Sequence, residues 1–227
     1  MTTPSPAPTP RRLVWERGTA EFDRVVLLSD AVIAIALTIL VLDLHVPIVS
    51  DPQHDLVQAV RDEGSSFIAF GLTFTIIAVA WISHHQFVST LARVDGAFIR
   101  WNFLYLFVIC LMPYTSSLIS EYASSSSFAV AVYIGLLIVL GAVGVLGELV
   151  VVRRGLGIAP GLTPQVRFHV IDNCARIAVL AIGVVIACVS PNPANGLLWL
   201  VVLWPVAALV GRRDPDRESH RPGGSSA

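Results

Sequence analysis

Residues 21–47 read EFDRVVLLSDAVIAIALTILVLDLHVP. After a polar start, almost every side chain from Ala31 to Leu42 is apolar. A helix needs about 20 mainly apolar residues to cross the hydrocarbon core of a bilayer. The stretch therefore predicts a transmembrane helix over roughly residues 24–46.

The composition of the whole chain is also that of a membrane protein. Of its 227 residues, 55% are hydrophobic and only 14% are charged, and the mean hydropathy is +0.73. A soluble domain usually carries about 25% charged residues. The net charge of −1 and the lack of a basic stripe with interleaved aromatic residues argue against a nucleic-acid partner.

Further apolar stretches follow, separated by short polar connections. They are continuous, which favours helices over the alternating strands of a barrel. The predicted fold is an all-α integral membrane protein with six transmembrane helices. The spans cover roughly residues 24–46, 66–90, 97–119, 127–152, 168–189 and 194–211. Segments 1–20 and 212–227, rich in Pro, Ser, Gly or charge, are expected to be disordered flanks of a transmembrane domain, 21–211.

Arginine placement predicts the orientation of these spans. The chain has no lysine, and all but two of its 15 arginines lie on one side of the predicted membrane. The exceptions are Arg61, in an opposite connection, and Arg176, within a span. Because cytoplasmic connections are enriched in arginine, both termini are expected in the cytoplasm.

Three polar residues stand near the start of the first span. Ionisable groups at membrane depth must be paired or hydrated, and Arg24, Ser29 and Asp30 precede a smooth apolar stretch. Two interpretations stay open. Ser29 and Asp30 cap the helix while Arg24 snorkels to the interface, or the three residues form part of a functional polar site.

A stripe of side chains follows on the same span. One face of the helix carries Ala31, Ile35, Thr38, Leu42 and His45, with Ile39 at its margin. Ordinary packing explains such a stripe in a single helix. In an oligomer, a ring of aliphatic side chains could instead form a hydrophobic constriction that gates by dewetting, with the Thr38 hydroxyl beside it. Periodicity does not choose between these alternatives.

No pattern of an enzyme or of a metal site is present in the sequence. It lacks a Ser-His-Asp order, a phosphate-cradling glycine loop and an H-E-x-x-H motif. Cys110, Cys174 and Cys188 all lie inside apolar stretches, which is typical of packing residues. We therefore expect no catalysis and no bound cofactor or metal.

Three motifs lie in order between residues 20 and 120. Arg24 is followed by LSD at 28–30, and the same span closes with DLHVP at 43–47. The second span ends with WISHHQF at 81–87, and the third begins with RWNFLYLF at 100–107, followed by MPYTS at 112–116. Together they resemble the transmembrane protein 175 family, the endosomal and lysosomal potassium channels and their shorter bacterial relatives. Leu28 stands where the family pattern R-x-x-x-F-S-D has Phe.

The resemblance implies a fold and a function. It implies a homotetramer of six-span subunits without a pore-loop selectivity filter, in the plasma (inner) membrane of a bacterium. The first span of each subunit would line a pore for passive potassium conduction. The implied partners are potassium ions, the lipid bilayer and further copies of the chain.

The resemblance also implies roles for individual residues. Ile35 would be the constriction, Ile39 and Leu42 further hydrophobic layers, and Thr38 a polar contact for the ion. A polar network near the cytoplasmic end would hold the first span in place, formed by Arg24, Ser29, Asp30, His84, Trp101 and Asn102.

Two other functions stay open. An ion-coupled secondary transporter would bind its coupling ion at Asp30, His84 and Asp172, and would show saturable, gradient-coupled uptake. Inverted repeats and broken helices favour such transporters, and the sequence shows no internal duplication. A membrane scaffold, or a subunit that does not conduct by itself, would show no flux.

Overall fold

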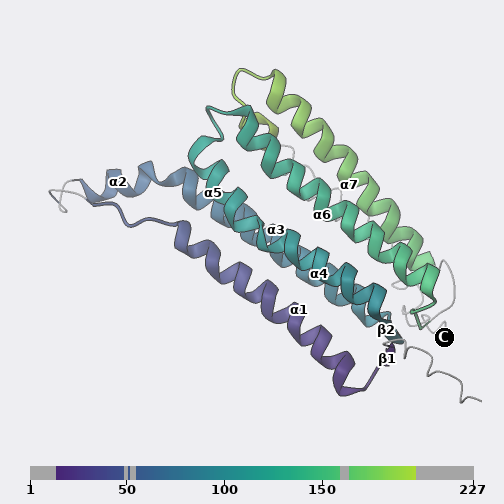
Figure 1. Cartoon of the computed structure of the whole chain (residues 1–227). Helices are drawn as coiled ribbons and strands as arrows, with labels where there is room; N and C mark the ends of the chain where they lie inside the picture. The colour runs from purple at the N-terminus through teal and green to yellow at the C-terminus, as the bar shows by residue number, and fades with distance from the viewer. Residues whose placement is uncertain (1–13, 49–50, 52–54, 159–163, 198–227) are drawn as a thin grey trace, which may run out of the picture.

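The chain forms a bundle of long helices with a small two-stranded ribbon at one end (Figure 1). This computed structural model describes residues 14–48, 51, 55–158 and 164–197. The elements are β1 (Val14–Glu16), α1 (Ala20–Ile39), the 3-10 helix η1 (Leu40–Asp43), α2 (Leu56–Asp62), α3 (Gly64–Ser89), β2 (Arg93–Asp95), α4 (Gly96–Cys110), α5 (Met112–Tyr122), α6 (Ser127–Arg154) and α7 (Pro164–Val189).

Four helical segments in the described part of the chain are long and apolar enough to cross a bilayer. They are Ala20–Asp43, Gly64–Ser89, Gly96–Tyr122 and Ser127–Arg154. These segments coincide with the first four predicted spans, so the chain is a multi-pass, largely helical membrane protein. The fifth predicted span lies in α7, whose apolar part is shorter, and the sixth falls almost wholly outside the described residues. Six spans and cytoplasmic termini remain predictions.

The third predicted span consists of two helices instead of one. α4 ends at Cys110, Leu111 lies between the helices, and Pro113 occupies the first turn of α5. Proline lacks a backbone N–H, and its ring clashes with the preceding turn of a helix, so a proline here interrupts the span. The predicted span over 97–119 thus agrees with the apolar segment Gly96–Tyr122, and the structure adds its interruption at Leu111.

A buried cluster of hydroxyl groups joins α5 to its neighbours. Thr73 on α3 donates to Ser116 on α5 over 3.0 Å, and Ser116 donates to the Ala69 carbonyl over 3.3 Å. The Thr73 oxygen also lies 3.0 Å from the hydroxyl of Tyr133 on α6. Since the Thr73 proton points at Ser116, Tyr133 is the donor in this third bond. Three helices thus share one chain of hydrogen bonds between buried side chains.

The ribbon ties the start of α1 to the rest of the bundle. Trp15 of β1 lies opposite Val94 of β2 in an antiparallel pair, and the Arg17 guanidinium donates to the Ser89 carbonyl at the end of α3 over 2.7 Å. The strand falls within segment 1–20, for which disorder was expected. Its pairing partner is distant in the sequence, so local composition could not reveal it.

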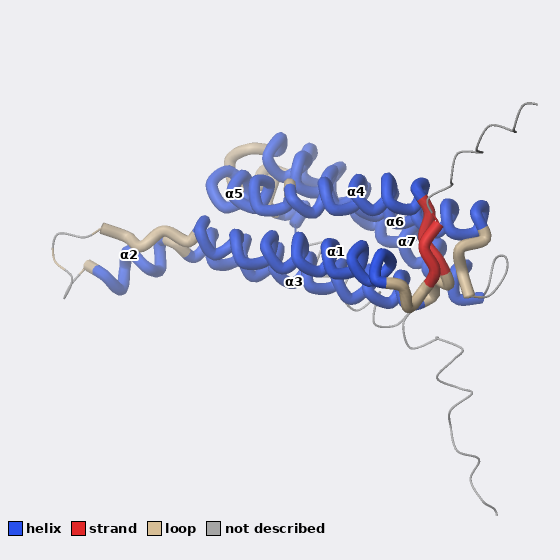
Figure 2. Tube along the Cα trace, turned by 60° about the horizontal axis from the view of Figure 1, so that its bottom comes forward, coloured by secondary structure: helices blue, strands red, loops and turns tan. Residues whose placement is uncertain are grey.

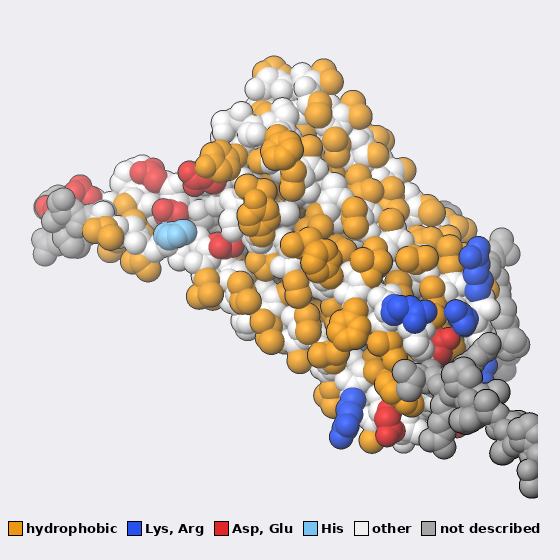
Figure 3. Space-filling model, in the orientation of Figure 1, with side chains coloured by type: hydrophobic (Ala, Val, Ile, Leu, Met, Phe, Trp, Pro, Cys, Tyr) orange, Lys and Arg blue, Asp and Glu red, His pale blue; other side chains and the backbone are white. Residues whose placement is uncertain are grey.

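The ends of the bundle differ in charge. Arginine side chains gather near the ribbon end, acidic side chains gather around α2, and the surface between is mainly hydrophobic (Figure 3). α2 projects from the end opposite the ribbon (Figure 2). The charged ends and apolar middle match a protein that lies across a bilayer.

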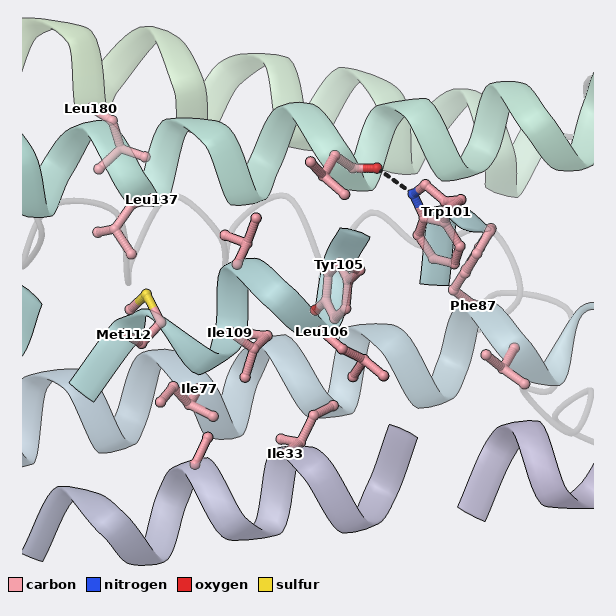
Figure 4. Packing of buried hydrophobic residues seen from close by; sticks show 14 of the residues in the cluster. Ile33, Ile77, Phe87, Trp101, Tyr105, Leu106, Ile109, Met112, Leu137 and Leu180 are labelled. Atoms are coloured by element: carbon pink, nitrogen blue, oxygen red, sulfur yellow. Dashed lines mark hydrogen bonds between the residues drawn. The ribbon is translucent and has the colours of Figure 1, made fainter. Parts of the chain in front are cut away.

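The core runs through the bundle, and one part of it lies where α1, α3 and α4 meet. Ile33 of α1, Ile77 of α3 and Ile109 of α4 are fully buried there and lie close together (Figure 4). α7 packs along α6, on the other side of the bundle from α1 (Figure 1). One long face of α1 is consequently left exposed by the part of the chain that the structure describes.

Candidate functional site

The exposed face of α1 carries the side chains that the sequence placed on its stripe. Ile35 is 56% exposed, Ile39 44% and Leu42 73%, and Thr38 is also exposed. The stripe therefore does not contribute to the core of its own subunit. The opposite face is buried and consists of Ser29, Ile33, Ala36 and Leu40.

The spacing of the buried residues explains why α1 turns this way. Ser29, Ile33, Ala36 and Leu40 recur at intervals of three or four, so they form one face of an α-helix. Burying them against α3 and α4 leaves the Ile35 face outward. Leu42 belongs to η1 and His45 follows that element, so α-helical spacing does not extend over the last part of the predicted stripe.

The Thr38 hydroxyl is held by its own helix. It donates to the Ile35 carbonyl over 2.9 Å, which uses its single proton. The oxygen keeps lone pairs that can accept a hydrogen bond or coordinate a cation. Thr38 thus offers one small acceptor among aliphatic side chains.

A buried polar cluster lies behind the exposed stripe and joins three helices. The Asn102 amide on α4 donates to the Ser29 hydroxyl on α1 over 2.9 Å, and Ser29 lies 3.0 Å from the Val25 carbonyl, to which it donates. The Asn102 oxygen lies 3.0 Å from Nε2 of His84 on α3. Because an amide oxygen only accepts, His84 is the donor. Ser29, His84 and Asn102 are 1%, 5% and 1% exposed, so these bonds fix α1 in a dry environment.

Aromatic rings enclose the histidine of this cluster. The Trp101 ring lies nearly parallel to the His84 ring, with centroids 6.1 Å apart and 9° between the planes. Tyr105 stacks against His84 at 5.0 Å, and its hydroxyl donates to the Ala80 carbonyl over 3.0 Å. Trp101 makes no hydrogen bond to the cluster. Its indole N–H donates to the Val143 carbonyl of α6 over 2.7 Å.

Two of the predicted network residues lie outside the buried cluster. Asp30 accepts a hydrogen bond from the indole N–H of Trp81 on α3 over 2.8 Å, at an exposed position. Arg24 is exposed at the side of α1 and joins none of these contacts. The structure thus brings Ser29, His84 and Asn102 together, places Trp101 beside them and leaves Arg24 apart.

Sequence reasoning did not assign roles to several residues at this site. Trp81 was part of a quoted motif, and its spacing of three from His84 places it on the neighbouring face of α3, within reach of Asp30. Tyr105 lies one turn after Trp101 on α4 and could have been found in the same way. The acceptor in α6, a backbone carbonyl, carries no sequence signal.

Comparisons with known proteins identify the relatives of the chain. Residues 24–113 match the model of a family described as the endosomal/lysosomal potassium channel TMEM175. A potassium channel of Chamaesiphon minutus is 36% identical over 132 residues, which are 55% of this chain and 63% of the relative. A potassium channel of Streptomyces collinus is 38% identical over 116 residues, which are 50% of this chain and 56% of the relative. The chain thus spans somewhat less than two thirds of these bacterial relatives.

A vertebrate relative carries a different name. The endosomal/lysosomal proton channel TMEM175 of Rattus norvegicus is 30% identical over 105 residues, which are 45% of this chain and 21% of the rat protein. The relatives are named as channels and not as enzymes.

Solved structures agree with these matches. The crystal structure of a lysosomal potassium-selective channel TMEM175 homolog from Chamaesiphon minutus is similar with a TM-score of 0.71 and 25% identity, over 87% of this chain and all of that one. The potassium channel MtTMEM175, at 19% identity and a TM-score of 0.59 over 90% of this chain and 97% of that one, shares the fold. The match to the family model falls on the segment that holds the stripe of α1 and the polar cluster of Ser29, His84 and Asn102, and over this segment the chain is similar to the TMEM175 channels.

Proposed function

We propose that the chain is the subunit of a potassium-permeable cation channel in the cell membrane of a bacterium. In this proposal, four copies assemble about an axis, and α1 of each copy faces the axis. The observation that carries the proposal is the exposed stripe of Ile35, Ile39 and Leu42 on a helix whose other face is firmly held. The described residues of one subunit do not enclose this stripe, so a conduit along it needs several copies.

The stripe supplies a mechanism for passive conduction. Ile35 forms the narrowest ring, Ile39 and Leu42 form further hydrophobic layers, and water leaves such a ring readily. An ion passes only if it sheds part of its hydration shell there. The Thr38 oxygen, one turn away, replaces part of that shell, and selectivity follows from the cost of dehydration.

The polar cluster has a supporting role in this mechanism. The cluster of Ser29, Asn102 and His84 fixes how α1 is rotated about its own long axis, so that the same side chains face the pore axis in every copy. A pore lined by aliphatic side chains depends on this orientation, because small shifts of Ile35 change the diameter of the pore.

The test is ion flux into vesicles that contain the purified protein. Ile35→Ala, or Ile35→Asn, widens or wets the ring, and we expect potassium flux to rise severalfold. Ile171→Ala is the matched control, since Ile171 is an equally exposed isoleucine on α7, on the other side of the bundle (Figure 1). Unchanged flux in both Ile35 variants removes the assignment of the pore.

The same vesicles distinguish the alternatives. Potassium, sodium and proton fluxes are measured in parallel, because the bacterial relatives are named potassium channels and the rat relative a proton channel. A channel gives flux that rises in proportion to the gradient. Saturable uptake coupled to a second ion would identify a transporter, and no flux would identify a scaffold.

A further inference from the structure

Gly147 on α6 lies against the ring of Trp101. A Cβ at position 147 would stand 2.3 Å from Cζ2 and 2.4 Å from Cε2 of Trp101, closer than real Cβ contacts. Both residues are buried. The ring can reach its place on α6 only because residue 147 has no side chain.

The same ring is fastened to the same helix by a hydrogen bond. The indole N–H of Trp101 donates to the Val143 carbonyl, one turn before Gly147 (Figure 4). The glycine and the carbonyl together determine the position of the indole along α6. A second ring, Phe87 of α3, meets Trp101 edge-on at 5.1 Å and 72°.

From this position Trp101 faces the polar cluster. Its ring lies parallel to His84, which bonds Asn102, which in turn bonds Ser29 of α1. Trp101 is also the chain neighbour of Asn102. A continuous set of contacts therefore runs from α6 to the helix that carries the exposed stripe.

We infer that Gly147 is a positioning residue for α1: it lets Trp101 lie flat against α6, and Trp101 holds the cluster that fixes the rotation of α1. The inference rests on the proposed channel function for its consequence in flux. α6 and α7 then form the frame against which each pore helix is oriented.

A second glycine on the same helix provides a matched control. A Cβ at Gly144 would meet the Asn173 amide nitrogen of α7 at 3.6 Å, an ordinary van der Waals contact. Gly144→Ala and Gly147→Ala make the same chemical change one turn apart, with the same gain in helix propensity. The two substitutions differ in whether the new methyl group collides with Trp101.

The experiment is a double-mutant cycle on the full chain in vesicles. We expect Gly147→Ala to lower potassium flux about fivefold or more, and Gly144→Ala to stay within about twofold of the unsubstituted protein. Trp101→Leu is expected to lower potassium flux by itself, and the smaller side chain leaves room for a Cβ at position 147. If Gly147 acts through Trp101, the double variant Trp101→Leu/Gly147→Ala passes the same potassium flux as Trp101→Leu. The inference is overturned if Gly147→Ala conducts as well as the unsubstituted protein. It is also overturned if the loss of flux in the double variant is the product of the losses in the two single variants.

A measurement that needs no flux separates this inference from the proposed function. The Trp101 indole N–H is identified by its disappearance from the NMR spectrum in Trp101→Leu, and its exchange with deuterium is followed. We expect exchange to be about tenfold faster in Gly147→Ala and unchanged in Gly144→Ala; equal exchange in both variants contradicts the inference even if the protein conducts. If the protein passes no potassium, the proposed function fails, and the exchange rates still decide the role of Gly147.

The yield of folded protein tests the inference if Gly147→Ala does not fold. If Gly147→Ala gives no folded protein, removing the colliding ring must restore it, so Trp101→Leu/Gly147→Ala is expected to fold as well as Trp101→Leu. A double variant that also fails to fold shows that Gly147 is needed for another reason and overturns the inference.

Discussion

Asn102 is the residue on which the buried contacts of three helices converge. It bonds Ser29 of α1 through its nitrogen and His84 of α3 through its oxygen, and it is itself part of α4. An asparagine suits this place because its side chain donates and accepts at the same time. An aliphatic residue could satisfy neither partner.

Truncating this residue tests its importance for stability. Asn102→Ala leaves the Ser29 hydroxyl with one partner fewer and the His84 N–H unpaired in a buried site. We expect the free energy of unfolding to fall by about 1–3 kcal/mol, measured by denaturant titration in detergent. Asn195→Ala is the control, since Asn195 bonds Ser190 in an exposed position. Equal stability of the two variants would show that the Asn102 contacts contribute nothing.

At the scale of the element, the hydroxyl cluster joins α5, the helix after the break, to α3 and α6. Tyr133→Phe keeps the ring and removes the donor to Thr73. We expect a loss of roughly 0.5–2 kcal/mol in the same titration, the range measured for hydrogen bonds between membrane helices. Tyr114→Phe, at an exposed position on α5, should change the free energy of unfolding by much less than this. The reverse order of the two effects would contradict the assigned contacts.

The ribbon gives a prediction about strand register. Trp15 and Val94 are register partners, so their Cα atoms lie within the distance that a disulfide spans. Trp15→Cys/Val94→Cys, in a background without the three native cysteines, is expected to cross-link under mild oxidation and to be reopened by reductant, as followed by mass spectrometry. Trp15→Cys/Arg93→Cys is shifted by one residue, and its side chains point to opposite faces. Cross-linking of the shifted pair alone would refute the register.

The elements differ in how well the sequence predicts them, for physical reasons. α1, α3 and α6 were predicted closely because each needs a long apolar run, which is a local property. The break at Leu111 was missed because Met112 and Tyr114 keep the stretch apolar around Pro113. β1 was missed because a three-residue strand is stabilised by a partner elsewhere in the chain.

The candidate site shows the same division. Helical period predicts that Ile35, Thr38 and Ile39 share a face of α1, but it does not predict that this face is exposed. The contacts of Ser29, His84 and Asn102 join residues from three of the quoted motifs. The places of Val143 and Gly147 depend on how α6 lies against α4. No pattern of residue types encodes that arrangement.

For the whole molecule, the arrangement of charge predicts orientation in the membrane. Arg153 lies near the ribbon end and Gln58 lies on α2, at the opposite end. In a background without native cysteines, a membrane-impermeant maleimide should label Gln58→Cys in intact cells, and Arg153→Cys only after permeabilisation. The opposite labelling would place the termini outside the cell and contradict the positive-inside assignment.

Silver block of Ile35→Cys is the most direct test of a pore lined by α1. Silver is a cation small enough to enter a potassium pore, and it binds thiols. A silver ion held by a cysteine that lines the conduit therefore blocks the passage of potassium. In a background without Cys110, Cys174 and Cys188, we expect micromolar silver to abolish potassium flux through Ile35→Cys and to leave Ile171→Cys unaffected. Persistent flux through Ile35→Cys after its thiol has reacted would show that ions pass elsewhere.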